Sequence, residues 1–150
     1  MQRSISHKNS VAPFVYVALF LVYSALSGVY LFLPPLLSVL FLFFTRALKR
    51  EDSIALLLIS LCLVIFEAQN DFMLFSTIIY FLFIYRYVLP KIYMSFSCLS
   101  CIKISIVLLA YIGFFVFNSI LSYIFLLPEP SINYYIVYYI VIEFFIVSVL

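Results

Sequence analysis

Apolar residues run along this chain in long continuous stretches, and short polar or proline-containing segments separate the stretches. A membrane-spanning helix needs about 20 apolar residues, whereas a strand of a membrane barrel alternates apolar and polar residues over about ten positions. Because the stretches are continuous, the pattern predicts an all-α protein in one domain. The predicted helices cover residues 11–33, 34–48, 53–66, 72–89, 103–127 and 131–150.

Prolines and charged clusters mark the predicted helix ends. Pro34 and Pro35 are tolerated only in the first turn of a helix, so the pair predicts the start of the second helix. That helix ends before the charged residues 49–52, and at 1.5 Å per residue it is roughly 20 Å long, short for a full crossing. A five-span arrangement follows if the first two helices form a hairpin that does not cross fully. The mixed segment 92–102 suits a position flat on the membrane surface.

The amino-acid composition indicates that these predicted helices span a membrane. Apolar residues make up 68% of the 150 positions, charged residues only 9%, and the mean hydropathy is +1.30. A soluble domain carries roughly 25% charged residues to cover its surface, and a disordered chain combines low hydrophobicity with high charge. The net charge of +2 offers no basic face to nucleic acid. The expected class is an integral membrane protein with the lipid bilayer as its solvent.

The basic residues predict an orientation, because Lys and Arg in short loops concentrate on the cytoplasmic side. Six crossings with the N-terminus inside place all eight on that side, and the acidic Glu67, Asp71 and Glu129 then lie in outer connections. Removing any one crossing scatters the basic residues over both faces. Both termini are therefore expected in the cytoplasm. The eight basic residues are Arg3, Lys8, Arg46, Lys49, Arg50, Arg86, Lys91 and Lys103.

Glu143 is the one carboxylate inside a predicted span. Its cost in hydrocarbon is about 2.5–3.5 kcal/mol, so it is expected to face the bundle interior and to have a partner there. Tyr135, Tyr139 and Glu143 recur every four residues and share one helix face. A proton or cation relay is one interpretation. We favour the other, a structural hydrogen bond to a neighbouring helix or a pair with Arg86 or Lys103.

Other polar positions carry weaker signals. Glu67 and Asp71 form an acidic pair that is predicted to be a solvated turn rather than a metal or acid–base site, and it is a plausible contact surface for a periplasmic partner. Asn118 is predicted to face a neighbouring helix together with Ser122, four residues further on. The pair Cys98–Cys101 lacks the two further ligands that zinc needs, so reduced thiols are expected.

Enzyme chemistry has no residues to carry it. A Ser-His-Asp set would depend on the single histidine, His7, and two glycines cannot build a phosphate-cradling loop. We therefore expect a protein without catalytic activity, metal or cofactor.

The layout resembles the rod shape-determining MreD family of small six-helix membrane proteins. The resemblance rests on a short second helix that starts at Pro34-Pro35 and ends in the basic stretch 44–50, on a third helix that ends in Glu67, and on a fourth that ends in the basic segment 86–91. The turn 68–71 departs from the family's usual glycine-containing turn. The resemblance implies a bacterial cytoplasmic (inner) membrane protein that binds an MreC-like single-span partner in the cell-elongation machinery for peptidoglycan synthesis.

A second hypothesis is a substrate-binding or transport subunit of a small-molecule importer of the vitamin type. Such a subunit needs a cavity with converging polar groups, for which Glu143, Tyr139 and Asn118 are the candidates. Replacing Glu143 by glutamine separates the hypotheses, because loss of uptake with normal folding favours transport and an unchanged phenotype favours a scaffold. A pore-forming protein fits poorly, since a pore needs polar faces on several helices.

Overall fold

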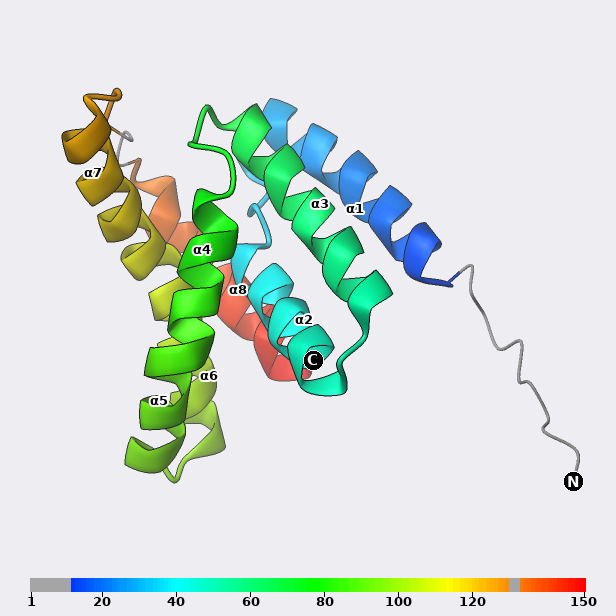
Figure 1. The fold of residues 1–150 in the computed structure, drawn as a ribbon, viewed down its shortest axis with the longest axis vertical. Helices are drawn as coiled ribbons and strands as arrows, with labels where there is room; N and C mark the ends of the chain where they lie inside the picture. Colours follow the sequence, from blue (N-terminus) through cyan, green and yellow to red (C-terminus); the bar gives the residue numbers. More distant parts are fainter. Residues whose placement is uncertain (1–11, 130–132) are drawn as a thin grey trace, which may run out of the picture.

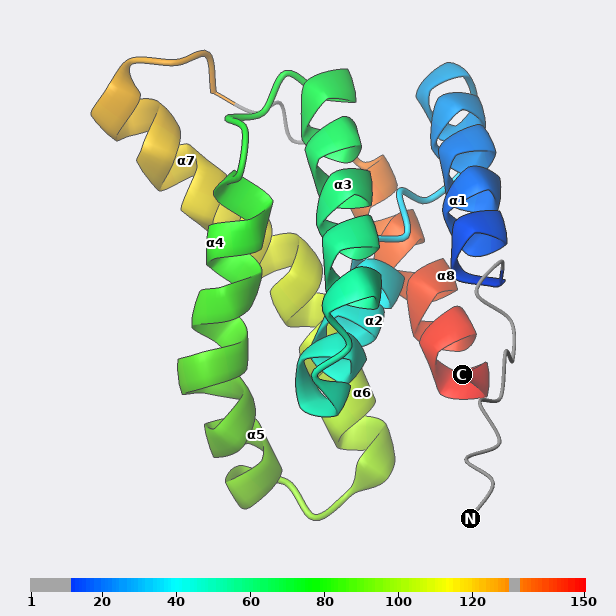
Figure 2. The same cartoon turned by 45° about the vertical axis from the view of Figure 1, so that its right-hand side comes forward.

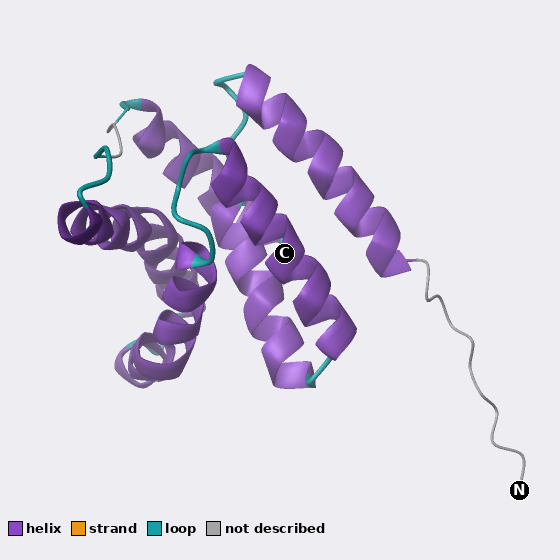
Figure 3. Ribbon diagram, turned by 45° about the horizontal axis from the view of Figure 1, so that its top comes forward, coloured by secondary structure: helices purple, strands orange, loops and turns teal. Residues whose placement is uncertain are grey.

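The computed structural model describes residues 12–129 and 133–150, and every regular element in those residues is helical (Figure 3). The prediction of an all-α fold is confirmed for this part of the chain. The elements are α1 (Ala12–Val29), α2 (Leu37–Arg50), α3 (Ser53–Gln69), α4 (Ser76–Phe83), the π-helical turn η1 (Ile84–Val88), α5 (Leu89–Ser95), α6 (Leu99–Leu108), the π-helical turn η2 (Leu109–Gly113), α7 (Phe114–Phe125) and α8 (Tyr135–Val149).

The ten elements join into six continuous helices, because η1 links α4 to α5 and η2 links α6 to α7 without a break in helical backbone. The number agrees with the pattern of apolar stretches. Among the described residues one helix, Leu99–Phe125 with 27 residues, is long and apolar enough to cross a membrane. The helices Phe14–Val29, Ser53–Gln69 and Tyr135–Val149 are apolar but shorter.

The helices run up and down between two ends of the molecule (Figures 1 and 2). α1 runs from about mid-height to one end of the molecule, the chain returns to about mid-height before α2 begins, and α2 then descends toward the opposite end. α3, the α4–α5 helix, the α6–α7 helix and α8 then alternate in direction. The beginning of α1 and the end of α8 therefore lie toward the same end of the molecule.

Charge separates between these ends. The end of α2, the start of α3, all of α5 and the start of α6 form what we call the basic end, which also contains Glu51 and Asp52. The opposite, acidic end contains Glu67, Asp71 and Glu129. The basic residues of the described part are Arg46, Lys49, Arg50, Arg86, Lys91 and Lys103, in α2, η1, α5 and α6. The remaining two, Arg3 and Lys8, lie outside the described residues, as do the predicted helix starts at positions 11 and 131.

Several helix boundaries differ from the prediction. α2 begins at Leu37 rather than at Pro34, because Leu36 has a left-handed backbone (φ 54°). α3 continues to Gln69, which places Glu67 within the helix, and α4 begins only at Ser76. The boundaries of an apolar stretch show which residues avoid water. The boundaries of a helix depend instead on where backbone hydrogen bonding stops, so a helix can extend beyond its apolar stretch.

The segment 92–102 does not lie apart from the helices. α5 continues to Ser95 and α6 begins at Leu99, so only residues 96–98 are non-helical. The basic segment at Pro90 is also helical, because Pro90 occupies the first turn of α5 directly after the π-helical turn η1. The π-helical turn already interrupts the regular series of backbone hydrogen bonds. A proline at this position, which has no N–H, therefore removes no further hydrogen bond. Residues 92–102 therefore form the ends of two helices and the exposed turn between them rather than a separate segment.

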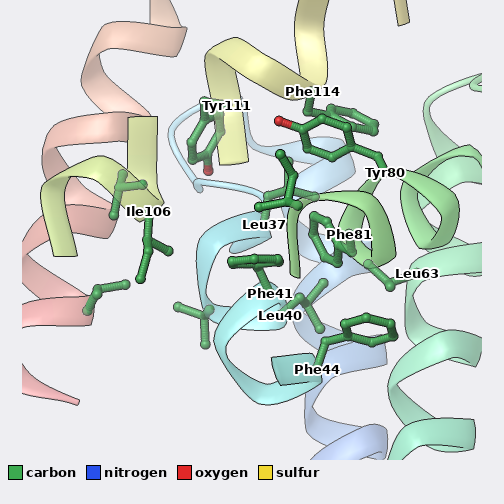
Figure 4. Packing of buried hydrophobic residues seen from close by; sticks show 14 of the residues in the cluster. Leu37, Leu40, Phe41, Phe44, Leu63, Tyr80, Phe81, Ile106, Tyr111 and Phe114 are labelled. Atoms are coloured by element: carbon green, nitrogen blue, oxygen red, sulfur yellow. The ribbon is translucent and has the colours of Figure 1, made fainter. Parts of the chain in front are cut away.

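The core is built around α2, which contacts α3, α8 and η2. Phe41 and Phe44 are buried against Phe81 of α4, with ring centroids 4.9 and 5.9 Å apart (Figure 4). Leu37 and Leu63 are also buried in this cluster. The short helix that the sequence predicts is thus the central element of the fold.

Candidate functional site

Glu143 lies in the middle of α8 and is completely buried. Its Oε2 atom accepts a hydrogen bond from the backbone N–H of Ser38 at 2.8 Å, and its Oε1 atom accepts one from the hydroxyl of Tyr111. Ser38 belongs to the first turn of α2, and Tyr111 belongs to η2. One carboxylate therefore joins three elements that are far apart in the sequence.

The contact explains how α2 can begin inside the bundle. The first N–H groups of a helix have no partner within the helix, and a buried donor without a partner costs about 1–3 kcal/mol. Leu36, at the capping position, has no side-chain oxygen to accept from them. Glu143 supplies the acceptor from another helix, and its acceptor oxygen lies at the positive end of the α2 dipole.

Glu67 has the same role at the start of α4. It is completely buried in the last turns of α3, and its oxygens accept from the backbone N–H of Phe75 at 2.6 Å, the backbone N–H of Thr77 at 2.5 Å and the hydroxyl of Ser76 at 3.1 Å. The prediction of a solvated acidic pair is wrong for Glu67. Asp71 alone is exposed, so the two carboxylates do not form one site.

The two helix starts share a local geometry. A bulky residue with a left-handed backbone precedes each helix, Leu36 before α2 and Phe75 before α4. In each helix the second residue donates its N–H to the remote glutamate, and the hydroxyl groups of those residues, Ser38 and Thr77, are buried without a hydrogen-bond partner. Each glutamate therefore replaces the capping side chain that its helix lacks.

The tyrosine face of α8 packs on the loop before α2. The hydroxyl of Tyr139 donates to the backbone carbonyl of Leu31, and the ring of Tyr135 stacks on that of Tyr139 with centroids 6.4 Å apart. Tyr135 also contacts the ring of Phe32 edge to face at 6.3 Å. The predicted face Tyr135–Tyr139–Glu143 thus holds the α1–α2 loop and the start of α2 together.

The remaining candidates do not join this cluster. Asn118 is buried, but its amide donates to the carbonyl of Phe114 within the same helix. Lys103 donates to the carbonyl of Ser148 at 2.9 Å, and Arg86 is exposed in η1. Of the two alternatives expected for Glu143, the structure shows the hydrogen bond to neighbouring helices and not the pair with Arg86 or Lys103, because hydroxyl and backbone donors bind both carboxylate oxygens.

A contact that the sequence pattern does not indicate joins the α4–α5 helix to the α6–α7 helix. The hydroxyl of Tyr80 donates to the carbonyl of Leu109 at 2.7 Å, at the start of the π-helical turn η2. Gly113 makes room for it, because a Cβ atom built on Gly113 would lie 2.0 Å from that hydroxyl oxygen. Gly113 is one of only two glycines in the chain, which was the available signal.

Replacing Gly113 by alanine is expected to push Tyr80 away from Leu109 and to lower the free energy of unfolding by about 1–3 kcal/mol. Thermal unfolding of the detergent-purified protein measures the change. Gly28→Ala is the matched control, since a Cβ atom on Gly28 has no neighbour within 4 Å. In the Gly113→Ala background, Tyr80→Phe should recover part of the loss. Equal effects of the two alanine variants would contradict the assignment.

Cys98 and Cys101 lie at the start of α6, at the basic end of the molecule. Both are free thiols, and Cys98 is exposed. A hydrogen bond from Cys101 lowers the pKa of the Cys98 thiol, which increases its thiolate fraction and hence its reactivity. Cys62, in contrast, is buried in α3. Within the described residues no group of three or more His, Cys, Asp or Glu side chains is placed to hold a metal ion.

Two cavities adjoin α1. A polar pocket of about 40 Å³ is lined by residues that include Ser24, Ser27 and Gln69, and a larger apolar groove of about 790 Å³ lies between α1, α2 and α3. Neither is lined by Glu143, Tyr139 or Asn118. The polar groups proposed for a small-molecule site therefore do not converge on either cavity.

Within residues 12–129 and 133–150 the regular structure is all helical, and one helix there is long and apolar enough to span a membrane. Comparisons of the chain with protein families, with curated proteins and with solved structures find no match.

Proposed function

We propose that this protein is a non-catalytic scaffold of the bacterial cytoplasmic membrane that crosses the bilayer six times with both termini inside. In this proposal it binds an MreC-like single-span partner within the cell-elongation machinery, as its resemblance to MreD proteins implies. The observation that carries the proposal is that both buried carboxylates, Glu67 and Glu143, accept hydrogen bonds from helix starts of the chain itself. Buried polar groups with this role build a scaffold rather than a reaction centre.

The distribution of charge supports six crossings. All six basic residues of the described part lie in α2, η1, α5 and α6, toward the basic end, and the beginning of α1 and the end of α8 face the same way. Loops on the cytoplasmic side are the ones that carry Lys and Arg. The basic end therefore faces the cytoplasm, and the turn that contains Asp71 faces outward.

The irregular second crossing is compatible with a bilayer. α2 has 14 residues and extends about 21 Å at 1.5 Å per residue, less than the hydrocarbon thickness of about 30 Å. The non-helical residues before it complete the crossing. Such backbone is tolerated at membrane depth only where protein covers it and satisfies its polar groups. Glu143, Tyr139 and Tyr23 satisfy polar groups of this region, because Glu143 accepts from the N–H of Ser38, and the hydroxyls of Tyr139 and Tyr23 donate to the carbonyls of Leu31 and Pro34.

The outward faces of the helices support contacts within the membrane. Large apolar side chains are exposed along α1, α3 and the α4–α5 helix, among them Val22, Leu57 and Ile79. Lipid or another membrane helix covers such a surface, because a soluble protein rarely exposes contiguous apolar patches of this kind. A single-span partner matches the geometry, since it offers one helix to one outward face.

The proposal is tested by topology and by co-purification. In intact cells, reporter tags at both ends of the chain should respond as cytoplasmic, and a membrane-impermeant maleimide should label Cys98 only after the cells are opened. Cys62 is the control that stays unlabelled in both cases. A mild-detergent pulldown of the tagged protein should then retain an MreC-like single-span protein. Tags on opposite sides of the membrane would overturn the six crossings, and a pulldown without that partner would overturn the scaffold role.

A further inference from the structure

The apolar groove between α1, α2 and α3 has the dimensions of a ligand site. Its volume of about 790 Å³ lies within the range of about 300–1,000 Å³ that is usual for small-molecule pockets. Phe20, Leu36, Val39 and Phe43 are among the side chains that line it. Tyr23 is one of its two tyrosines, and its hydroxyl already donates to Pro34. The groove therefore offers an occupant an apolar surface.

The same face of α2 changes from apolar to cationic at the basic end. Val39, Phe43, Arg46 and Arg50 follow one another at spacings of four, three and four residues, which places them on one helix face. Val39 and Phe43 line the groove, and both arginines are exposed. Glu51 follows in the turn beyond the helix. The groove therefore leads into two neighbouring guanidinium groups.

The third cation of α2 is engaged elsewhere. The ammonium group of Lys49 lies 5.3 Å from the ring centroid of Tyr93 in α5, on a different face of α2. Among residues 12–129 and 133–150, no carboxylate forms an ion pair with Arg46 or Arg50, and no hydrogen bond involves their side chains. Two guanidinium groups at the mouth of an apolar groove complement an amphiphile that has an anionic head.

The length of this face matches one leaflet of a bilayer. Leu36 and Arg46 are ten residues apart, which is about 15 Å along the helix axis. Half of the hydrocarbon thickness of about 30 Å is the same distance. A phosphate held at Arg46 therefore places the end of its acyl chain near Leu36, where α2 begins at about mid-height in the bundle.

We infer that the groove binds an acyl chain of an anionic phospholipid from the cytoplasmic leaflet, with the lipid phosphate held by Arg46 and Arg50. Guanidinium groups bind phosphate oxygens through paired hydrogen bonds, and basic pockets between helices on the cytoplasmic side are suited to acidic head groups. The inference rests on the orientation in the proposed function, which puts the basic end in the cytoplasm. It does not depend on the identity of any protein partner.

The test uses the full chain, purified in a mild detergent and mixed with equal amounts of phosphatidylglycerol and phosphatidylcholine. Native mass spectrometry counts the lipids that remain bound. The unaltered protein should retain at least fivefold more phosphatidylglycerol than phosphatidylcholine. The double variant Arg46→Gln/Arg50→Gln should retain the two lipids equally, because it loses the phosphate contacts and keeps the groove.

Two further variants separate the head-group site from the groove. Lys91→Gln removes an exposed basic-end cation that lies on α5 and should leave the preference unchanged. Ala55→Trp fills the groove, which Ala55 lines, and should reduce the retention of both lipids. If Ala55→Trp does not fold, the arginine variant decides the question by itself.

Equal retention of both lipids by the unaltered protein would overturn the inference, as would an unchanged preference in the double arginine variant. Displacement of the bound lipid by a co-purified membrane helix would also overturn it, by making the groove a protein interface. These results are distinct from those that test the proposed function. If the termini lie on opposite sides of the membrane while phosphatidylglycerol is still preferred, the lipid site stands and the six-crossing topology falls.

Discussion

Replacing Glu143 by leucine is expected to lower the free energy of unfolding of the detergent-purified protein by about 2–6 kcal/mol, because two buried donors lose their acceptor at about 1–3 kcal/mol each. The donors are the N–H of Ser38 and the hydroxyl of Tyr111. Insertion of α8 should not suffer, since a carboxylate at membrane depth itself costs about 2.5–3.5 kcal/mol. The expected variant is thus inserted in the membrane but poorly packed, as limited proteolysis and thermal unfolding would show.

A second variant that tests the Glu143 contact is Tyr111→Phe in the Glu143→Leu background. It removes one of the orphaned donors, so the double variant should be more stable than Glu143→Leu alone. Tyr138→Phe, which alters an exposed tyrosine of α8, the helix of Glu143, is the control and should change the stability little. If Glu143→Leu unfolds at the temperature of the unaltered protein, Glu143 does not hold the start of α2.

Glu143→Gln separates structure from transport. The amide keeps an oxygen that can accept from Ser38 or Tyr111, so most of the fold should survive. A scaffold with this substitution should still bind its partner. Loss of a transport activity in a folded Glu143→Gln protein would instead favour the importer hypothesis.

Replacing Glu67 by alanine is expected to lower the free energy of unfolding by about 2–4 kcal/mol, because the donors of Phe75, Ser76 and Thr77 lose their acceptor. The first turn of α4 should open. Hydrogen exchange at the amides of Phe75 and Thr77 would report that opening directly, and thermal unfolding would report the overall loss.

Asp71→Ala is the matched control for Glu67→Ala. It removes a carboxylate only four residues further along the chain, but from an exposed position. Exposed substitutions of this kind usually change stability by less than about 0.5 kcal/mol. Similar losses in the two variants would mean that Glu67 acts by its charge at the acidic end and not as a cap for α4.

The sequence predicted the burial of Glu143 but not its partners. A carboxylate within an apolar stretch is costly, which fixes its inward direction, and its spacing from Tyr139 places both on one face. Arg86 and Lys103 were the candidate partners because charged side chains can be identified directly from the sequence. Backbone N–H groups belong to every residue except proline, so the sequence could not show that α2 would leave one of them free beside α8.

The prediction that Glu67 lies in a solvated turn was wrong for a related reason. The residues after it, Gln69, Asn70 and Asp71, are polar, and a polar cluster normally indicates a solvated turn. Helix α3 continues to Gln69, so Glu67 lies on its inner face, whereas Asp71 lies in the turn beyond the end of the helix. A shift of one turn in a helix boundary is small in sequence terms, but it decides whether a carboxylate meets water or the start of another helix.

The segregation of charge was predicted more securely. The basic residues of α2, α5 and α6 were assigned to connections on one side by the six-helix count alone, and the folded chain brings those segments to one end. That agreement needs only the number of helices and their alternating direction. The contact of Tyr80 with η2 depends on atomic packing around Gly113, and the rarity of glycine in the chain marks the position without naming Tyr80 as the partner.

The distance along the chain between Ser38 and Glu143 has a consequence for biosynthesis. Their hydrogen bond joins residues that are 105 positions apart. At about 5–20 residues per second, a ribosome completes α8 roughly 5–20 s after it has made α2. During that interval the N–H of Ser38 lacks its Glu143 acceptor, so we expect the start of α2 to reach its final packing only after α8 has been made.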